Sequence, residues 1–161
     1  MDERGDRIER LYAAHIQEAT RLAYLLTGER ELAEDIAQDA FVKAAGRVWY
    51  VRGEDAFGAY LMKSVVNVCK NHWRRRKVER NYLEKAKAEH RATSHQADVP
   101  QWLAIVDALG ELPLRQRTAV VLRHYADLSE RRTADLMGCT VGTVKTLTSR
   151  GLATLRERMD P

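Results

Sequence analysis

The chain has 161 residues and a mass of 18.4 kDa, and its 27 basic and 23 acidic side chains give a formal net charge of +4. Apolar residues make up 45% of the chain and charged residues 31%, and no apolar run approaches the roughly 18 residues that a membrane span needs. This composition excludes a disordered chain and a transmembrane protein, and the two cysteines, Cys69 and Cys139, are too far apart in sequence to indicate a metal motif or a disulfide framework.

The first eighty residues predict three helices. Apolar residues at three- and four-residue steps predict a helix over 6–26, and similar stripes predict helices over 29–49 and 56–80. Gly28 is suited to a left-handed cap after the first helix, and the stretch 51–55 interrupts the pattern before the third, where Asp55 could cap the helix.

The charge is unevenly distributed along these helices. Residues 1–62 carry 8 basic and 12 acidic groups, residues 63–91 carry 10 and 3, and residues 92–161 carry 9 and 8. An acidic segment beside a basic one indicates two partners of opposite charge, and the alternative is a solvated charged surface without a partner.

The remaining residues predict a linker and a second helical region. Residues 81–99 lose the helical period and are polar, which is typical of a linker. Four helices are expected after it, over 101–109, 113–125, 129–137 and 140–158. The last two, separated by a short turn with Gly138, form a helix-turn-helix pattern, for which a plain helical hairpin is the alternative.

The final predicted helix has one apolar face and one polar face. Helical spacing groups Val144, Thr148, Gly151, Leu152 and Leu155 on the apolar side. The other side carries small, polar and basic residues that suit a major groove, namely Gly142, Lys145, Thr146 and Ser149, with Thr143 and Arg150 at its flank.

Two sets of motifs resemble known protein regions. The end of the chain resembles region 4 of an RNA polymerase sigma factor, on markers that include Leu112-Pro113, Leu128-Ser129, Gly138 and Gly142-Thr143-Val144-Lys145. The stretch ELAEDIAQDAFVKA at 31–44 resembles region 2.2, and residues 51–76 resemble regions 2.3 and 2.4. Two such domains joined only by a linker resemble the extracytoplasmic function (group IV) sigma factors, and within them the actinobacterial SigE-type subgroup.

For the first domain, the resemblance implies two binding sites. Region 2.2 of such factors grips the coiled coil of the polymerase β′ subunit, which implies a core polymerase site at Glu34, Asp35, Gln38, Asp39 and Phe41. For Phe41, burial in the core is an equally good interpretation. The loop and helix that follow bind the −10 element and an unpaired base, which implies a site at Val51, Arg52, Gly53, Glu54, Asp55, Tyr60, Lys63, Asn67, Lys70, Asn71, Arg74 and Arg75.

For the second domain, the resemblance implies reading of the −35 element and docking on the polymerase β flap. The expected DNA-binding residues are Arg115, Arg117, Arg131, Arg132, Thr143, Lys145, Thr146, Ser149 and Arg150. The chain departs from the family at Arg132-Thr133-Ala134, where members often have Glu-Ile-Ala, and at Leu147, where many have Arg or Gln. At Leu147, either the helix is rotated or the −35 element is read through fewer direct contacts.

These observations predict an all-α protein of two small helical domains, with sigma region 2 over 1–80, a flexible linker over 81–100 and sigma region 4 over 101–161. The expected function is that of a sigma factor, which binds core polymerase and promoter DNA, needs no cofactor and is not an enzyme. An anti-sigma factor is a further candidate partner, because such regulators are common in the family. The charged N-terminus lacks a secretory segment, so the cytoplasm is the expected location, without membrane contact.

Two other classes of protein are alternatives to this expectation. A stand-alone helix-turn-helix repressor or activator would bind duplex DNA tightly without polymerase. An enzyme is disfavoured because the five histidines show no metal-ligand spacing and no phosphate-binding loop is evident; they are His15, His72, His90, His95 and His124.

Overall fold

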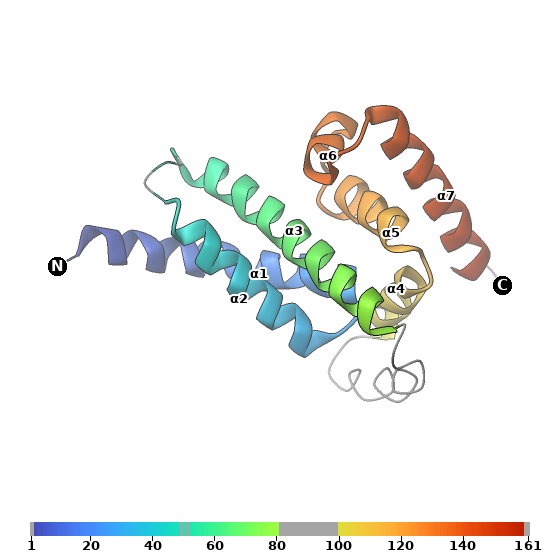
Figure 1. Cartoon of the computed structure of the whole chain (residues 1–161), viewed down its shortest axis with the longest axis horizontal. Coiled ribbons are helices and arrows are strands. Elements are labelled where there is room, and N and C mark those ends of the chain that lie inside the picture. Colours follow the sequence, from blue (N-terminus) through green and yellow to red (C-terminus); the bar gives the residue numbers. More distant parts are fainter. Residues whose placement is uncertain (1, 49, 51, 81–99, 160–161) are drawn as a thin grey trace. The chain divides into compact units, whose positions relative to one another are not determined.

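A computed structural model of the chain describes residues 2–48, 50, 52–80 and 100–159 (Figure 1). These residues form helices and connecting turns, with no strand among them, which confirms the all-α prediction. By their contacts the residues divide into two compact units, Met1–Tyr24 with Glu29–Ala86 and Leu25–Gly28 with Lys87–Pro161. The predicted linker lies outside the described residues, except for its last position.

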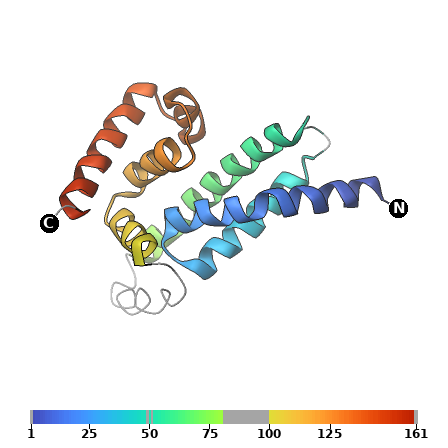
Figure 2. The same cartoon turned by 180° about the vertical axis from the view of Figure 1, so that it is seen from behind.

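The first unit is built from three helices, except that the last residues of the first helix, from Leu25 on, group with the second unit. They are α1 (Glu3–Thr27), α2 (Arg30–Ala45) and α3 (Glu54–Arg80), and α2 and α3 lie side by side in both views (Figures 1 and 2). The predicted helices are confirmed, with different ends. α2 stops at Ala45 rather than at residue 49, because the chain goes over into tight turns from Gly46. α3 begins at Glu54 because Gly53 takes a left-handed φ of 86°, so Asp55 lies in the first turn and does not cap the helix.

The core of the first unit combines small residues of α2 with larger residues of α3. The inward face of α2 is alanine-rich, with Ala33, Ile36, Ala37, Ala40, Phe41 and Ala44 buried. Small side chains let two helices approach closely, and the fully buried Phe57 and Val65 of α3 fill the space that remains. α1 joins this core through aromatic rings, because Tyr12 packs on Phe41 and His15 lies near Phe57.

The second unit contains the five remaining elements. They are α4 (Pro100–Gly110), α5 (Leu114–Val120), the π-helix η2 (Val121–Tyr125), α6 (Glu130–Met137) and α7 (Val141–Met159). α7 packs against α4, α5 and α6. The sequence predicts one α-helix over 113–125, but its second half is a π-helix in which the Ala126 N–H bonds to the Val121 carbonyl at 3.0 Å.

The predicted helix-turn-helix is present and its ends are capped as expected. The Ser129 hydroxyl accepts a hydrogen bond from the Arg132 N–H at 3.1 Å, and Thr140 does the same for the Thr143 N–H at 3.1 Å. Between the two helices Gly138 takes a left-handed φ of 66°. A residue without Cβ adopts that φ at little cost, so the sharp turn that sets α7 against α6 follows from this glycine.

Across the described ranges, no helix is both long enough and apolar enough to cross a bilayer.

Candidate nucleic-acid and protein interfaces

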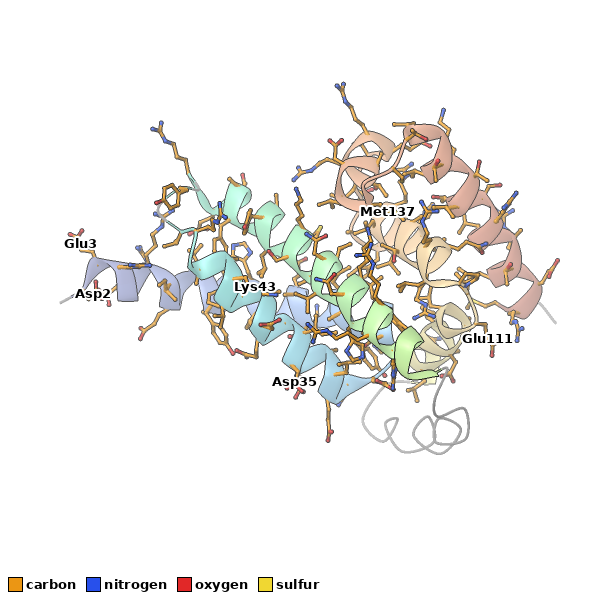
Figure 3. All side chains as sticks on the ribbon, viewed as in Figure 1. Asp2, Glu3, Asp35, Lys43, Glu111 and Met137 are labelled. Atoms are coloured by element: carbon orange, nitrogen blue, oxygen red, sulfur yellow. The ribbon has the colours of Figure 1, made fainter. Side chains whose placement is uncertain are left out.

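The outward face of α2 is an acidic surface. Glu34, Asp35, Gln38 and Asp39 are all exposed, and we call these four residues the α2 ridge. Asp35 is labelled on the outer side of α2 in Figure 3. Asp39 pairs with Lys43 of the same helix at 3.4 Å, an exposed i,i+4 pair worth about 0.5 kcal/mol, so a charged partner can displace it easily. The ridge is therefore a solvated negative surface on a rigid helix.

Phe41 does not belong to this surface. Its side chain is 6% exposed, and its ring packs on Tyr12 at a centroid distance of 5.1 Å and on Phe57 at 5.7 Å. The core interpretation of Phe41 is confirmed, and Phe41 packs beneath the ridge, while its contact with a partner stays a prediction. An exposed apolar side chain lies beside the ridge: Val42 is 68% exposed and one helical turn from Gln38. The sequence could have indicated this contact, because Val42 is an apolar residue on an otherwise charged helix face.

The exposed side of α3 is polar and basic. Six polar and basic residues predicted to bind the −10 element are exposed along this helix. We call them the α3 polar face: Lys63, Asn67, Lys70, Asn71, Arg74 and Arg75. Tyr60 is half-buried beside it. In the loop and first turn before it, Arg52, Gly53, Glu54 and Asp55 are exposed, whereas Val51 lies outside the described residues. The positive charge and the amide groups thus follow one side of a single helix.

A groove of about 240 Å³ separates the α2 ridge from the α3 polar face. Both helices line this groove. Its apolar lining residues are Leu32, Ile36 and Val68. Its charged and polar lining residues are Asp35, Asp39, Lys43, Asn71, His72 and Arg75. The two surfaces therefore share a border within one unit.

Arg76 has a different role from its neighbours Arg74 and Arg75. Its guanidinium donates to Glu29 at 3.0 Å, and both side chains are about a quarter exposed. The same guanidinium lies 5.6 Å from the centroid of the Trp73 ring. Arg76 thus ties the later part of α3 to the residue that precedes α2, a contact that the run of basic residues in the sequence did not reveal.

In the second unit, α7 presents the polar face that the sequence predicts. Lys145, Thr146, Ser149 and Arg150 are exposed and Thr143 is half-buried. Val144 and Gly151 are buried on the opposite side, as expected, so the helix is not rotated by the leucine at position 147, which is half-buried. The Thr146 hydroxyl donates to the Gly142 carbonyl at 3.1 Å and keeps its lone pairs for a partner's donor.

The arginines predicted to bind phosphates fall into two groups. Arg115, Arg131 and Arg132 are exposed at the start of α5 and α6. Arg117 is 6% exposed and donates to the carbonyls of Gly110 and Leu112 at 3.3 and 3.0 Å. The prediction for Arg117 is therefore wrong: its charge satisfies the carbonyls where α4 ends, and its burial removes it from DNA.

No group of three or more histidine, cysteine, aspartate or glutamate side chains among the described residues is arranged to hold a metal ion. A helix-turn-helix with an exposed polar and basic face, in a chain that also carries a basic helix, is the architecture of a DNA-binding protein.

Comparisons with known proteins identify the family. Residues 11–79 match the model for Sigma-70 region 2 and residues 102–155 the model for Sigma-70, region 4. The chain is 34% identical over 148 residues to the RNA polymerase sigma-E factor of Streptomyces coelicolor, covering 87% of this chain and 82% of that protein. It is 33% identical over 154 residues to the ECF RNA polymerase sigma factor SigM of Mycobacterium tuberculosis, covering 94% and 77%.

Two solved structures share the fold. One is the sigma factor RpoE in complex with the anti-sigma factor NepR from Bartonella quintana, with a TM-score of 0.74 at 24% identity over 94% of this chain and 95% of that chain. The other is CnrH in complex with the cytosolic domain of CnrY, with a TM-score of 0.66 at 22% identity over 95% and 87%. The chain belongs to the ECF RNA polymerase sigma factors. It is accordingly not an enzyme but a subunit that binds core RNA polymerase and directs transcription from specific promoters.

Proposed function

We propose that the α2 ridge is the surface through which this sigma factor binds the coiled coil of the polymerase β′ subunit. The observation that carries the proposal is the row of exposed carboxylates at Glu34, Asp35 and Asp39, with Gln38 between them. A negative row on a rigid helix attracts a basic partner and fixes its register. Val42 supplies an exposed apolar contact beside the charges, and Phe41 keeps the helix in place from within.

The α3 polar face and the loop before it bind the −10 element in this proposal. Lys63, Lys70 and Arg74 supply cations along one side of the helix, which suits the phosphates of an opened strand. Asn67 and Asn71 lie between them and can donate and accept hydrogen bonds at the edge of an unpaired base. The exposed turn at 52–55 provides backbone amides for a flipped base, and Arg75 adds a phosphate contact.

α7 reads the −35 element in this proposal. Lys145, Thr146, Ser149 and Arg150 face a major groove, with Thr143 at the flank, and Arg115, Arg131 and Arg132 contact phosphates. Because α7 keeps the expected buried face, the leucine at position 147 removes a polar contact without bringing another residue into its place. We therefore expect this protein to read the −35 element with fewer direct contacts than many relatives.

The remaining partners follow from the family. We propose that the second unit docks on the polymerase β flap and that the protein acts in the cytoplasm, where the polymerase works. An anti-sigma factor is a further proposed partner, since the two solved structures with this fold are complexes, one with the anti-sigma factor NepR and one with the cytosolic domain of CnrY.

Core binding is tested by charge reversal. Asp35→Arg should abolish co-elution of the full chain with core polymerase and promoter-dependent transcription, because it places a cation on the ridge. Glu157→Arg is the matched control, since it makes the same change in net charge at an exposed position of α7. If Asp35→Arg assembles as well as the control, the docking surface is assigned wrongly.

Promoter binding is tested with and without core polymerase. A sigma factor with two small DNA-binding units should shift promoter DNA weakly alone and strongly with core, because core holds both units at once. Lys145→Ala should weaken the dependence of transcription on the −35 sequence at the base that Lys145 contacts, and Asn67→Ala should do so at one base of the −10 element. Tight, specific duplex binding by the chain alone would instead favour a repressor or activator.

A further inference from the structure

A hydrogen bond joins α1 to the α2 ridge. The Gln38 Nε2 donates to the Tyr12 hydroxyl oxygen at 2.6 Å, although the two residues are 26 positions apart in the chain. Both side chains reach solvent, and Tyr12 is 37% exposed. Tyr12 therefore lies at the edge of the proposed docking surface, on a helix that the sequence motifs did not associate with polymerase binding.

The Tyr12 ring is held in place from below. It meets the Phe41 ring edge-on, with a centroid distance of 5.1 Å and an interplanar angle of 87°. Phe41 in turn packs on the fully buried Phe57 of α3, at 5.7 Å. This chain of rings links the exposed hydroxyl to the core of the unit, so the hydroxyl has a fixed position although the solvent reaches it.

A fixed hydroxyl fixes the amide that bonds to it. An exposed glutamine ordinarily samples many rotamers, and ordering it on binding costs conformational entropy. With Nε2 held by Tyr12, the amide of Gln38 is oriented before a partner arrives, and its Oε1 is the atom that can accept a hydrogen bond from that partner. The acceptor lies between Asp35 and Asp39 in sequence and on the same outward side of α2.

We infer that Tyr12 is a positioning residue for core polymerase binding: through its hydrogen bond to Gln38 it presents a preordered acceptor, within the α2 ridge, to a lysine, arginine or amide donor of a basic polymerase helix. This inference rests on the proposed function of the ridge. It adds α1 to the docking surface and predicts that Tyr12 acts through Gln38 rather than on its own.

The experiment measures the affinity of the full chain for core polymerase in a double-mutant cycle. Tyr12→Phe keeps the ring and removes the hydroxyl, and should weaken binding about three- to tenfold while thermal unfolding is unchanged. Gln38→Ala should weaken binding at least as much. In the Gln38→Ala background, Tyr12→Phe should then change the affinity by less than about twofold, because the group it positions is gone.

Two further variants make each outcome decisive. Tyr50→Phe removes a hydroxyl from another exposed tyrosine of the same unit and should leave core binding unaffected.

Asp35→Arg tests the ridge itself. If it abolishes binding while Tyr12→Phe has no effect, the positioning role of Tyr12 is wrong and the docking surface is still supported. The positioning role is equally overturned if the effects of Tyr12→Phe and Gln38→Ala add up, or if Tyr12→Phe lowers the unfolding temperature in parallel with affinity. If Asp35→Arg leaves binding intact, the docking surface is wrong.

Discussion

A Cβ atom placed on Gly151 of α7 would lie 2.6 Å from Cγ2 of Val120 of α5. It would lie 3.4 Å from the Gln116 carbonyl oxygen, which is an ordinary van der Waals distance, so the Val120 methyl group is the obstacle. The close packing of the recognition helix on α5 therefore depends on the absence of a side chain at position 151.

Gly151→Ala should destabilise the second unit. The clash should cost about 1–3 kcal/mol, partly offset by about 1 kcal/mol from the better helix propensity of alanine. Hydrogen exchange of the amides in α5 and α7 measures the change in this unit alone. Val120→Ala removes the obstructing methyl group, so the double variant should be more stable than the sum of the two single effects predicts. In Gly142→Ala, the new Cβ would meet only the Thr140 hydroxyl, at 3.9 Å, so this control should show no loss.

Thr133→Val should stabilise the second unit. Thr133 is fully buried, and its hydroxyl has no hydrogen-bond partner. Replacing the hydroxyl by a methyl group of similar size removes an unsatisfied polar atom, which should raise the free energy of unfolding by about 1 kcal/mol. Thr118→Val is the matched control, because the buried Thr118 donates to the Leu114 carbonyl at 2.8 Å and should gain nothing. Equal effects at the two sites would show that the unsatisfied hydroxyl is not the cause.

Most of the fold could be predicted from local pattern. The helical period placed the helices, and Gly28, Ser129, Gly138 and Thr140 marked ends that the structure confirms, because capping and left-handed turns depend on a few neighbouring residues. The π-helix over Val121–Tyr125 was not predicted, since the consecutive apolar residues Val120, Val121 and Leu122 fit an α-helix as well as a wider turn.

Sequence spacing could not assign the role of residues whose partners lie far away in the chain. Arg117 looks like one more basic residue in the sequence, but its guanidinium donates to the carbonyl of Leu26, 91 positions away, as well as to those of Gly110 and Leu112. Arg76 likewise looks equivalent to Arg75 until its pair with Glu29, 47 positions away, is known. Sequence spacing shows which residues share a face of a helix, but not what the neighbouring helix offers to that face.

Asp127→Gly should be tolerated, whereas Asp127→Val should not. Asp127 has a left-handed φ of 55°, the only such non-glycine residue in the described part of the chain. Leu128 follows Asp127, and its carbonyl accepts a hydrogen bond from the Arg123 guanidinium. This bond holds the segment before α6 in place. Glycine adopts this φ freely and aspartate tolerates it, but a β-branched residue should lose about 1–2 kcal/mol or more.

The measurement for Asp127 is thermal unfolding of the full chain together with promoter-dependent transcription at a temperature below the transition. Asp127→Asn should behave like the natural residue, because asparagine also tolerates left-handed backbone and the carboxylate is exposed. A loss in Asp127→Asn equal to that in Asp127→Val would indicate that the charge, and not the backbone, is what this position requires.

Arg75→Ala and Arg76→Ala should have opposite signatures although the residues are adjacent. Arg75 is exposed on the α3 polar face, so its loss should reduce the salt dependence of promoter binding by the polymerase holoenzyme. The slope of log K against log salt concentration should fall in magnitude by about 0.7–0.9.

Arg76 is engaged with Glu29, so its loss should leave that slope unchanged and lower the stability of the first unit by about 1 kcal/mol. Glu29→Gln should reproduce the stability loss of Arg76→Ala, and the double variant should lose no more than either single variant if the ion pair is the cause. A reduced salt slope in Arg76→Ala would instead place Arg76 against DNA.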